Sequence, residues 1–138
     1  NDYVVVKPAS VINVGFEISI LTESGSQVNA IASIAQLLKD EFDQNKMQLG
    51  QSYLVGTLIK KISQIDGVLN INYIKAFNKV GGGYSTSALD STMILDINTN
   101  EIDITSGAIK VSGDQILQLK SPEKDIVVIP VTQNTSII

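Results

Sequence analysis

The sequence predicts an α+β fold: a strand, two amphipathic helices, a second strand and then a small antiparallel β-meander. Near the amino terminus, apolar residues alternate with polar ones, and in the next two segments they recur at three- and four-residue spacing. In the last third they form short β-branched runs separated by Gly, Asn, Ser and Pro. With 138 residues, 43% of them apolar, the chain has the size of one compact domain.

The first predicted strand covers residues 14–21. Its even-numbered positions up to residue 20 are Val, Phe or Ile, and the positions between them are Gly, Glu and Ser. A period of two places all the apolar side chains on one side of a strand. We therefore expect a strand with one buried face, preceded by a short Val-rich run at residues 4–6.

Two helices are predicted, over residues 28–42 and 52–65. Each shows the apolar spacing of a single helix face, which in the first helix consists of Val28, Ile31, Ile34, Ala35, Leu38 and Phe42. The second helix ends at Asp66-Gly67, because Gly accepts the left-handed conformation that terminates a helix. We expect both helices to bury one face against the sheet.

A second strand is expected over residues 68–77, where the composition becomes rich in Val, Ile, Tyr and Phe. The following stretch, residues 78–91, contains three consecutive glycines and several Ser and Thr residues, which indicates a long loop. We divide the chain here into an α+β part (residues 1–80), a Gly/Ser/Thr-rich loop (81–91) and a β-rich part (92–138) packed on or beside the first.

The predicted meander consists of five short runs in the last part of the chain. Turn-forming residues separate these runs at regular intervals, as expected for an antiparallel unit. The runs cover residues 92–97, 101–105, 108–111, 115–119 and 126–132.

Composition argues against several functional classes. The chain contains no His, Cys, Trp or Arg, which removes the usual general base, the thiol nucleophile and the usual zinc ligands, so an enzyme is disfavoured and no cofactor or metal is expected. A net charge of −4 with scattered lysines argues against nucleic-acid binding. The longest apolar run, residues 126–131, is too short to cross a bilayer, so no membrane insertion is expected.

One motif has the spacing of a calcium loop. Asp96-x-Asn98-x-Asn100 places oxygen ligands at alternate positions, like the opening of an EF-hand. The EF-hand loop needs Gly at its sixth position and Glu at its twelfth, but this chain has Glu101 and Gly107 there. We therefore interpret the motif as a polar hairpin turn.

The carboxy-terminal part of the chain is unusually aliphatic. An all-apolar run is either a central strand or a surface that a partner completes. Because few charges protect the strand edges in this part of the chain, we expect subunit contacts here. The candidate interface residues are Ile126, Val128, Pro130, Ile137 and Ile138.

The order of elements in the first half resembles a known family. Lys7-Pro8 after a Val-rich strand, Leu49-Gly50 between the helices and Asp66-Gly67-Val68 at the next strand are similar to the carboxy-terminal region of contractile-tail phage baseplate proteins. These are the baseplate J-like proteins, which include the T4-type baseplate wedge proteins. The resemblance covers residues 4–77, and residues 81–138 match no motif of this family.

The resemblance implies a structural domain of the virion tail baseplate that links wedges around the hub and is assembled in the host cytoplasm. The implied partners are further copies of the chain, with a dimer expected, and other baseplate subunits, with no small-molecule substrate. Two alternatives stay open. One is a carbohydrate- or peptide-binding module that uses the loop at residues 78–91 with Tyr73 or Tyr84, and the other is an enzyme that uses two carboxylates as acid and base.

Overall fold

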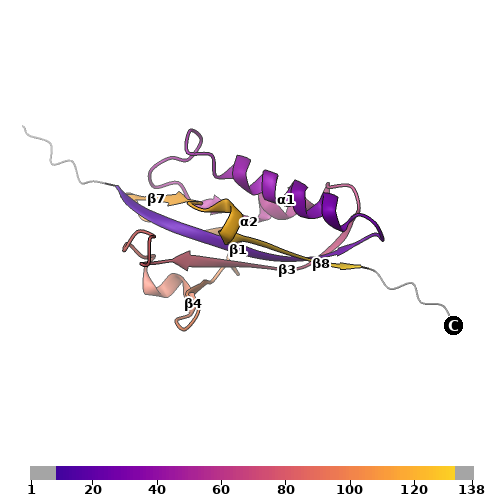
Figure 1. The fold of residues 1–138 in the computed structure, drawn as a ribbon. Coiled ribbons are helices and arrows are strands. Elements are labelled where there is room, and N and C mark those ends of the chain that lie inside the picture. Colours follow the sequence, from indigo (N-terminus) through magenta and orange to yellow (C-terminus); the bar gives the residue numbers. More distant parts are fainter. Residues whose placement is uncertain (1–8, 133–138) are drawn as a thin grey trace, which may run out of the picture.

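The computed structural model describes residues 9–132 and confirms the α+β class (Figure 1). The helical elements are α1 (Gln27–Glu41), α2 (Val55–Ser63), the 3-10 turn η1 (Ser91–Met93) and α3 (Pro122–Asp125). The strands are β1 (Ser10–Thr22), β2 (Tyr53–Leu54), β3 (Val68–Lys79), β4 (Ile94–Asp96), β5 (Glu101–Ile102), β6 (Ala108–Ile109), β7 (Gln115–Gln118) and β8 (Ile126–Thr132). The predicted order of strand, two helices and strand is therefore confirmed for β1, α1, α2 and β3, with the short β2 added before α2.

The long strand β1 is the centre of a six-stranded mixed sheet. One edge of β1 pairs antiparallel with β3, which is followed outward by β5 and β4. The other edge pairs in parallel with two strands in succession, β7 beside the start of β1 and β8 beside its remainder. The short helix α3 lies between these two strands in the chain, and β2 pairs with β6 in a separate two-stranded ladder.

The prediction of an antiparallel meander in the last third of the chain is wrong. Only β4 and β5 pair with each other as an antiparallel hairpin, while β6 pairs with β2, and β7 and β8 join β1 in parallel. The turn residues showed where strands end, but strand partners are set by long-range packing that short sequence windows do not contain. Strands from both sides of the loop at residues 81–91 consequently belong to one sheet.

One face of the sheet carries the core, beneath α1 and α2. The even-numbered side chains of β1 from Ile12 to Ile20 are all buried, as the alternation predicted, and pack with the buried residues of the helices. The expectation that only this face is buried is wrong, because Gly15 and Ser19 on the other face are buried as well. Phe42, just after α1, joins these layers, because its ring centroid lies 5.4 Å from that of Phe16 and 4.6 Å from that of Tyr53. The buried residues of α1 and α2 are Ala30, Ile34, Leu38, Val55, Leu58 and Ile62.

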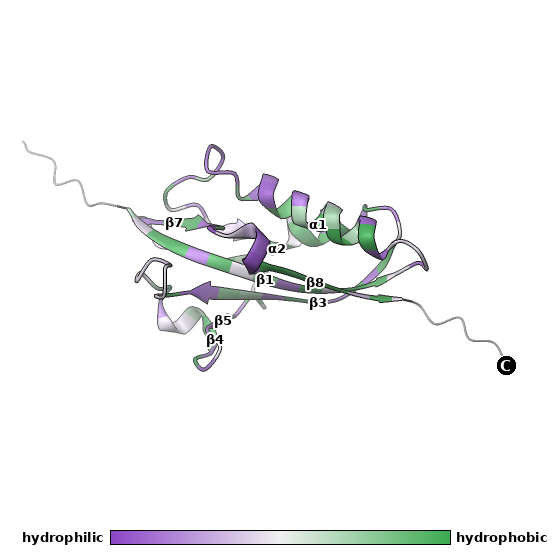
Figure 2. Cartoon of the chain, viewed as in Figure 1, coloured by the Kyte–Doolittle hydropathy of each residue, from purple (hydrophilic) through white to green (hydrophobic). Residues whose placement is uncertain are grey.

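The buried stripe of α1 differs from the predicted one. Val28 is 81% exposed and Ile31 is also exposed, whereas Ala30 is fully buried. The stripe therefore follows Ala30, Ile34 and Leu38 at four-residue spacing, which is one side of the helix. A small residue at position 30 allows the start of α1 to lie close to the sheet, and the apolar start of the helix is visible in green in Figure 2.

Two buried asparagines hold the loop that follows β3. The Asn13 Oδ1 accepts the N–H of Ser85 at 2.7 Å, and the Asn78 Oδ1 accepts the N–H of Leu89 at 2.9 Å. The Asn78 side chain also donates to the backbone carbonyl of Asn13 at 3.3 Å. Gly81, Gly82 and Gly83 all adopt positive φ, a conformation that Gly adopts without steric cost. Side-chain amides thus satisfy backbone groups that lack a strand partner in this loop.

Candidate interaction surface

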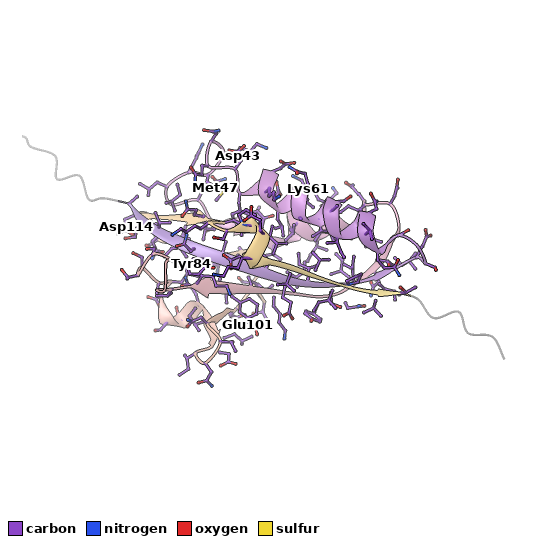
Figure 3. The ribbon with its side chains drawn as sticks, in the orientation of Figure 1. Asp43, Met47, Lys61, Tyr84, Glu101 and Asp114 are labelled. Carbon is purple, nitrogen blue, oxygen red and sulfur yellow. The ribbon has the colours of Figure 1, made fainter. Side chains whose placement is uncertain are left out.

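The side of the sheet opposite α1 and α2 forms a separate surface, which we call the outer face. In the register of the sheet, the buried Ile18 pairs with the partly buried Ile74, and both belong to the core beneath the helices, so the positions between such pairs point to the other side. In Figure 1, α1 lies on one side of β1 and β3, and β4 lies on the other. Figure 3 shows the same division, with Lys61 on the helical side and Glu101 on the opposite side.

A row of exposed aliphatic side chains runs along β8 on the outer face. Val127, Ile129 and Val131 are 46%, 38% and 45% exposed. Leu21 of β1 pairs with Val131 and is half-buried on the same face. We call these four residues the apolar strip. β8 contains no charged residue, and Figure 2 shows it in green.

Tyr73 adds an aromatic side chain to the same face. It shares a row with Ser19 and Ile129, because Ser19 pairs with Tyr73 on one side and with Ile129 on the other. The Tyr73 hydroxyl donates to the Glu17 Oε2 at 2.8 Å, and this hydrogen bond raises the pKa of Tyr73 above its ordinary value. The Lys75 ammonium lies 5.1 Å from the centroid of the ring. Tyr73 is thus an oriented, partly exposed ring beside an aliphatic row, a type of residue that is enriched in protein interfaces.

The sequence-predicted interface residues lie mostly on the other side of β8. Ile126 and Val128 are partly buried and pack against the core, and Pro130 follows them at the same two-residue spacing. Ile137 and Ile138 lie outside the described residues. Every residue from 126 to 131 is apolar, so no alternation in the sequence distinguishes the two faces. Only the pairing of β8 with β1 shows that the odd-numbered residues face outward.

The free edge of β8 borders the apolar strip. Within residues 9–132, β8 pairs with β1 alone, so its second edge has no strand partner. Charged residues commonly protect such edges from pairing with another chain, but β8 has none. Pro130 removes one N–H donor from the strand, which weakens pairing without preventing it.

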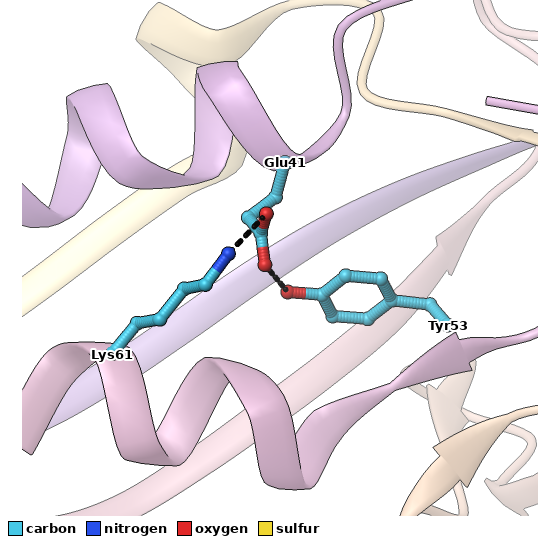
Figure 4. Close-up of polar contacts among 3 residues, drawn as sticks. All are labelled: Glu41, Tyr53 and Lys61. Carbon is cyan, nitrogen blue, oxygen red and sulfur yellow. Dashed lines mark hydrogen bonds and ion pairs between the residues drawn. The ribbon is translucent and has the colours of Figure 1, made fainter. Parts of the chain in front are cut away.

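A polar cluster lies on the helical side, in a cavity of about 300 Å³ near the end of α1 (Figure 4). The Lys61 ammonium is 3.0 Å from the Glu41 Oε2, and the Tyr53 hydroxyl donates to the Glu41 Oε1 at 3.2 Å. Burial, together with the neighbouring Glu41 carboxylate, raises the pKa of Tyr53 far above its ordinary value. The phenol therefore stays protonated and acts as a donor that links β2, α1 and α2, which is a structural role.

A second polar cluster lies where α3 passes the outer face. Asp125 is only 3% exposed, and its Oδ1 accepts a hydrogen bond from the Tyr84 hydroxyl at 2.8 Å and lies 4.0 Å from the Lys79 ammonium. Lys120 and Lys124 place their ammonium groups 6.0 Å and 5.8 Å from the Tyr84 ring centroid (Figure 3 labels Tyr84). The hydrogen bond to Asp125 raises the pKa of Tyr84. The aromatic residue of the 78–91 loop is thus engaged within the protein.

The motif Asp96-x-Asn98-x-Asn100 forms the turn between β4 and β5, as predicted. The Asp96 Oδ1 accepts the N–H of Asn98 at 2.9 Å, and Asn100 adopts a φ of 57°. In the described part of the chain, no three His, Cys, Asp or Glu residues are grouped to hold a metal ion. No helix between residues 9 and 132 has the length and apolarity needed to span a membrane.

Comparison with known proteins does not place the chain in a family. No protein-family model matches the chain, and no curated protein matches its sequence. The geometry of the outer face therefore carries the functional argument.

Proposed function

We propose that this chain is a non-enzymatic assembly domain of a contractile phage tail baseplate, making subunit contacts that link wedges around the hub. The observation that carries the proposal is the apolar strip on the outer face, next to the free edge of β8. Single exposed apolar residues are common on protein surfaces, but a continuous row of them marks an interaction site. The resemblance of residues 4–77 to the baseplate J-like proteins supports the baseplate and virion location.

The apolar strip is too small to form a stable interface by itself. Full burial of an aliphatic side chain stabilises by about 1.5–3 kcal/mol, so finishing the burial of three half-exposed residues contributes about 3 kcal/mol. Association costs at least about 4 kcal/mol in lost freedom, so the strip alone cannot hold two subunits together. The contact must therefore include Tyr73 and backbone hydrogen bonds along the free edge of β8, with a second copy of the chain or another baseplate subunit as the partner.

The test compares two lysine substitutions on opposite sides of the molecule. Ile129→Lys places a charge in the apolar strip, and the matched control Val28→Lys places one at an exposed aliphatic residue on α1. Molar mass is measured by light scattering from about 1 μM to about 1 mM, the range in which weak interfaces dissociate. We expect the unmodified chain and Val28→Lys to form a dimer or larger species at high concentration, and Ile129→Lys to stay monomeric.

Two results would each contradict part of the proposal. A strict monomer at every concentration would refute self-association and leave another baseplate subunit as the partner, which Ile129→Lys should then prevent from binding. An oligomer that Ile129→Lys leaves intact would refute the apolar strip as the interface. The baseplate location is tested separately, by electron microscopy of contractile tails labelled with an antibody against this chain. Labelling absent from the baseplate end of the tail would refute that location.

A further inference from the structure

We propose that a cavity beside Asp125 binds a neutral, polyhydroxylated ligand about the size of one sugar ring. The cavity has a volume of about 270 Å³ and lies on the outer face, where β1, β3, α3 and the start of β8 meet. The turn between β4 and β5, on the side of the sheet opposite α1 in Figure 1, adds Thr99 to its lining. This proposal goes beyond the assembly function and does not depend on it.

Asp125 supplies the strongest reason to expect a ligand. It is 97% buried, and its Oδ1 is engaged by Tyr84, whereas its Oδ2 has no hydrogen-bond donor among the residues that the structure describes. A buried acceptor without a donor is costly, and a ligand that brings a donor recovers this cost. Tyr84 acts as a positioning residue, because its hydrogen bond holds one carboxylate oxygen and leaves the other without a partner.

Lys79 is the movable part of the cavity wall. Its ammonium lies 4.0 Å from the Asp125 Oδ1 and 5.8 Å from the centroid of the Phe77 ring, so this one side chain covers both groups. The side chain is more than one third exposed, and the long aliphatic stem of Lys gives it several rotamers. The proposal requires Lys79 to shift toward solvent, so that the ligand reaches the Asp125 carboxylate and one face of the Phe77 ring.

The charges of the lining favour a neutral ligand over an ion. Glu17 and Asp125 contribute two carboxylates, and Lys79 and Lys124 contribute two ammonium groups, so the formal charges cancel. An anion would meet the carboxylates and a cation would meet the ammonium groups. Hydroxyl groups both donate and accept hydrogen bonds, so a polyol satisfies both kinds of side chain and the Thr99 hydroxyl.

An apolar wall completes the match with a sugar ring. Phe77 and Val127 line the cavity among these polar groups. Binding sites for small ligands commonly combine an apolar surface with a few convergent polar groups. The C–H groups on one face of a pyranose can pack against an aromatic ring, while its equatorial hydroxyls reach the charged rim.

The experiment is a titration of the ¹⁵N-labelled full chain with D-glucose, D-galactose and N-acetyl-D-glucosamine, followed by amide chemical shifts. We expect at least one sugar to cause saturable shifts confined to residues around the cavity, such as Lys79, Thr99 and Val127. Asp125→Asn and Lys124→Met should each weaken binding by about fivefold or more, as expected for the loss of a hydrogen bond to a charged group. Lys39→Met, which removes an exposed ammonium from α1, should leave the titration unchanged.

Lys124→Met keeps the test decisive if Asp125→Asn disturbs the fold, because Lys124 is exposed. The proposal is overturned if none of the three sugars causes saturable shifts, or if the shifts are the same in Lys124→Met as in the unmodified chain. It is also overturned if sodium acetate or ethylammonium chloride binds the cavity more tightly than the sugars. Ile129→Lys should abolish self-association yet retain the sugar shifts, so the two proposals fail independently.

Discussion

The contact between Gly67 and Ser26 allows a stability prediction with an internal control. Gly67 ends the segment between α2 and β3 with a φ of +88°, and its carbonyl accepts the N–H of Glu23 at 2.9 Å. A Cβ at position 67 would lie 2.5 Å from both the Cβ and the Oγ of Ser26. Gly25 has nearly the same φ, +86°, but a Cβ there would meet nothing within 4 Å.

The two glycines therefore separate backbone strain from a steric clash. The left-handed conformation costs a residue with a Cβ about 1–2 kcal/mol, and this is the whole cost expected for Gly25→Ala. In Gly67→Ala the clash with Ser26 forces the backbone apart and adds about 1–3 kcal/mol, as overpacking does in cores. We expect a loss of about 2–5 kcal/mol for Gly67→Ala, which is a large fraction of the stability of a domain of this size.

A double-mutant cycle with Ser26→Gly isolates the clash. Ser26 precedes α1 without a side-chain capping hydrogen bond, so its replacement removes the obstructing atoms and no cap. Urea unfolding followed by circular dichroism gives the free energy of each variant. Gly67→Ala in the Ser26→Gly background should cost no more than Gly25→Ala does in the unmodified chain. Equal losses for Gly67→Ala and Gly25→Ala in the unmodified background would refute the steric argument.

Two further predictions concern buried polar groups. Folding raises the pKa of Tyr53 from 10.0, so the stability it contributes is complete below pH 10 and is lost as the pH rises above this value. Urea unfolding at several pH values between about 10 and 11.5 gives the free energy of unfolding of the unmodified chain and of Tyr53→Phe. With rising pH this free energy should fall more steeply in the unmodified chain, by about 1.4 kcal/mol per pH unit. Equal slopes in the two proteins would contradict the assignment of this loss to Tyr53. Asn78→Ala should cost about 2–4 kcal/mol and abolish hydrogen-exchange protection of the Leu89 amide, whereas Asn98→Ala in an exposed turn should do neither.

Local patterns in the sequence predicted the elements that depend on neighbouring residues. The alternation over residues 14–21 gave the buried face of β1, and the helical spacing gave α1 and α2 to within a few residues. The buried side of α1 was misjudged because Val28 and Ile31 fit the same spacing as Ala30 and Ile34. Ala30 contributes little to an apolar pattern because its side chain is small, although this small size allows α1 to approach the sheet.

The candidate surface was harder to predict, because it depends on pairings between distant segments. In β8 all positions up to Val131 are apolar, so the sequence gives two equally good choices of outward face. The parallel pairing of β8 with β1 decides between them, and that pairing joins segments more than one hundred residues apart. The Asp125 cluster likewise brings together Lys79, Tyr84 and α3, whose spacing in the chain follows no recognisable motif.

One interruption in the strand pairing explains why both features lie on the outer face. β7 pairs with β1 as far as Asn13, and β8 resumes the pairing at Phe16, so the edge of β1 is unpaired around Gly15. A Cβ at Gly15 would lie 3.2 Å from the carbonyl oxygen of Asp125 and 2.9 Å from the Lys79 Cε. Because Gly15 has no side chain, the end of α3 can pack closely against β1, which places Asp125 beside Lys79. The same crossing directs the chain back to the edge of β1, where β8 presents Val127, Ile129 and Val131 outward. The space that Gly15 leaves thus helps to form the cavity, while the register of β8 on β1 sets which side chains of the apolar strip face outward.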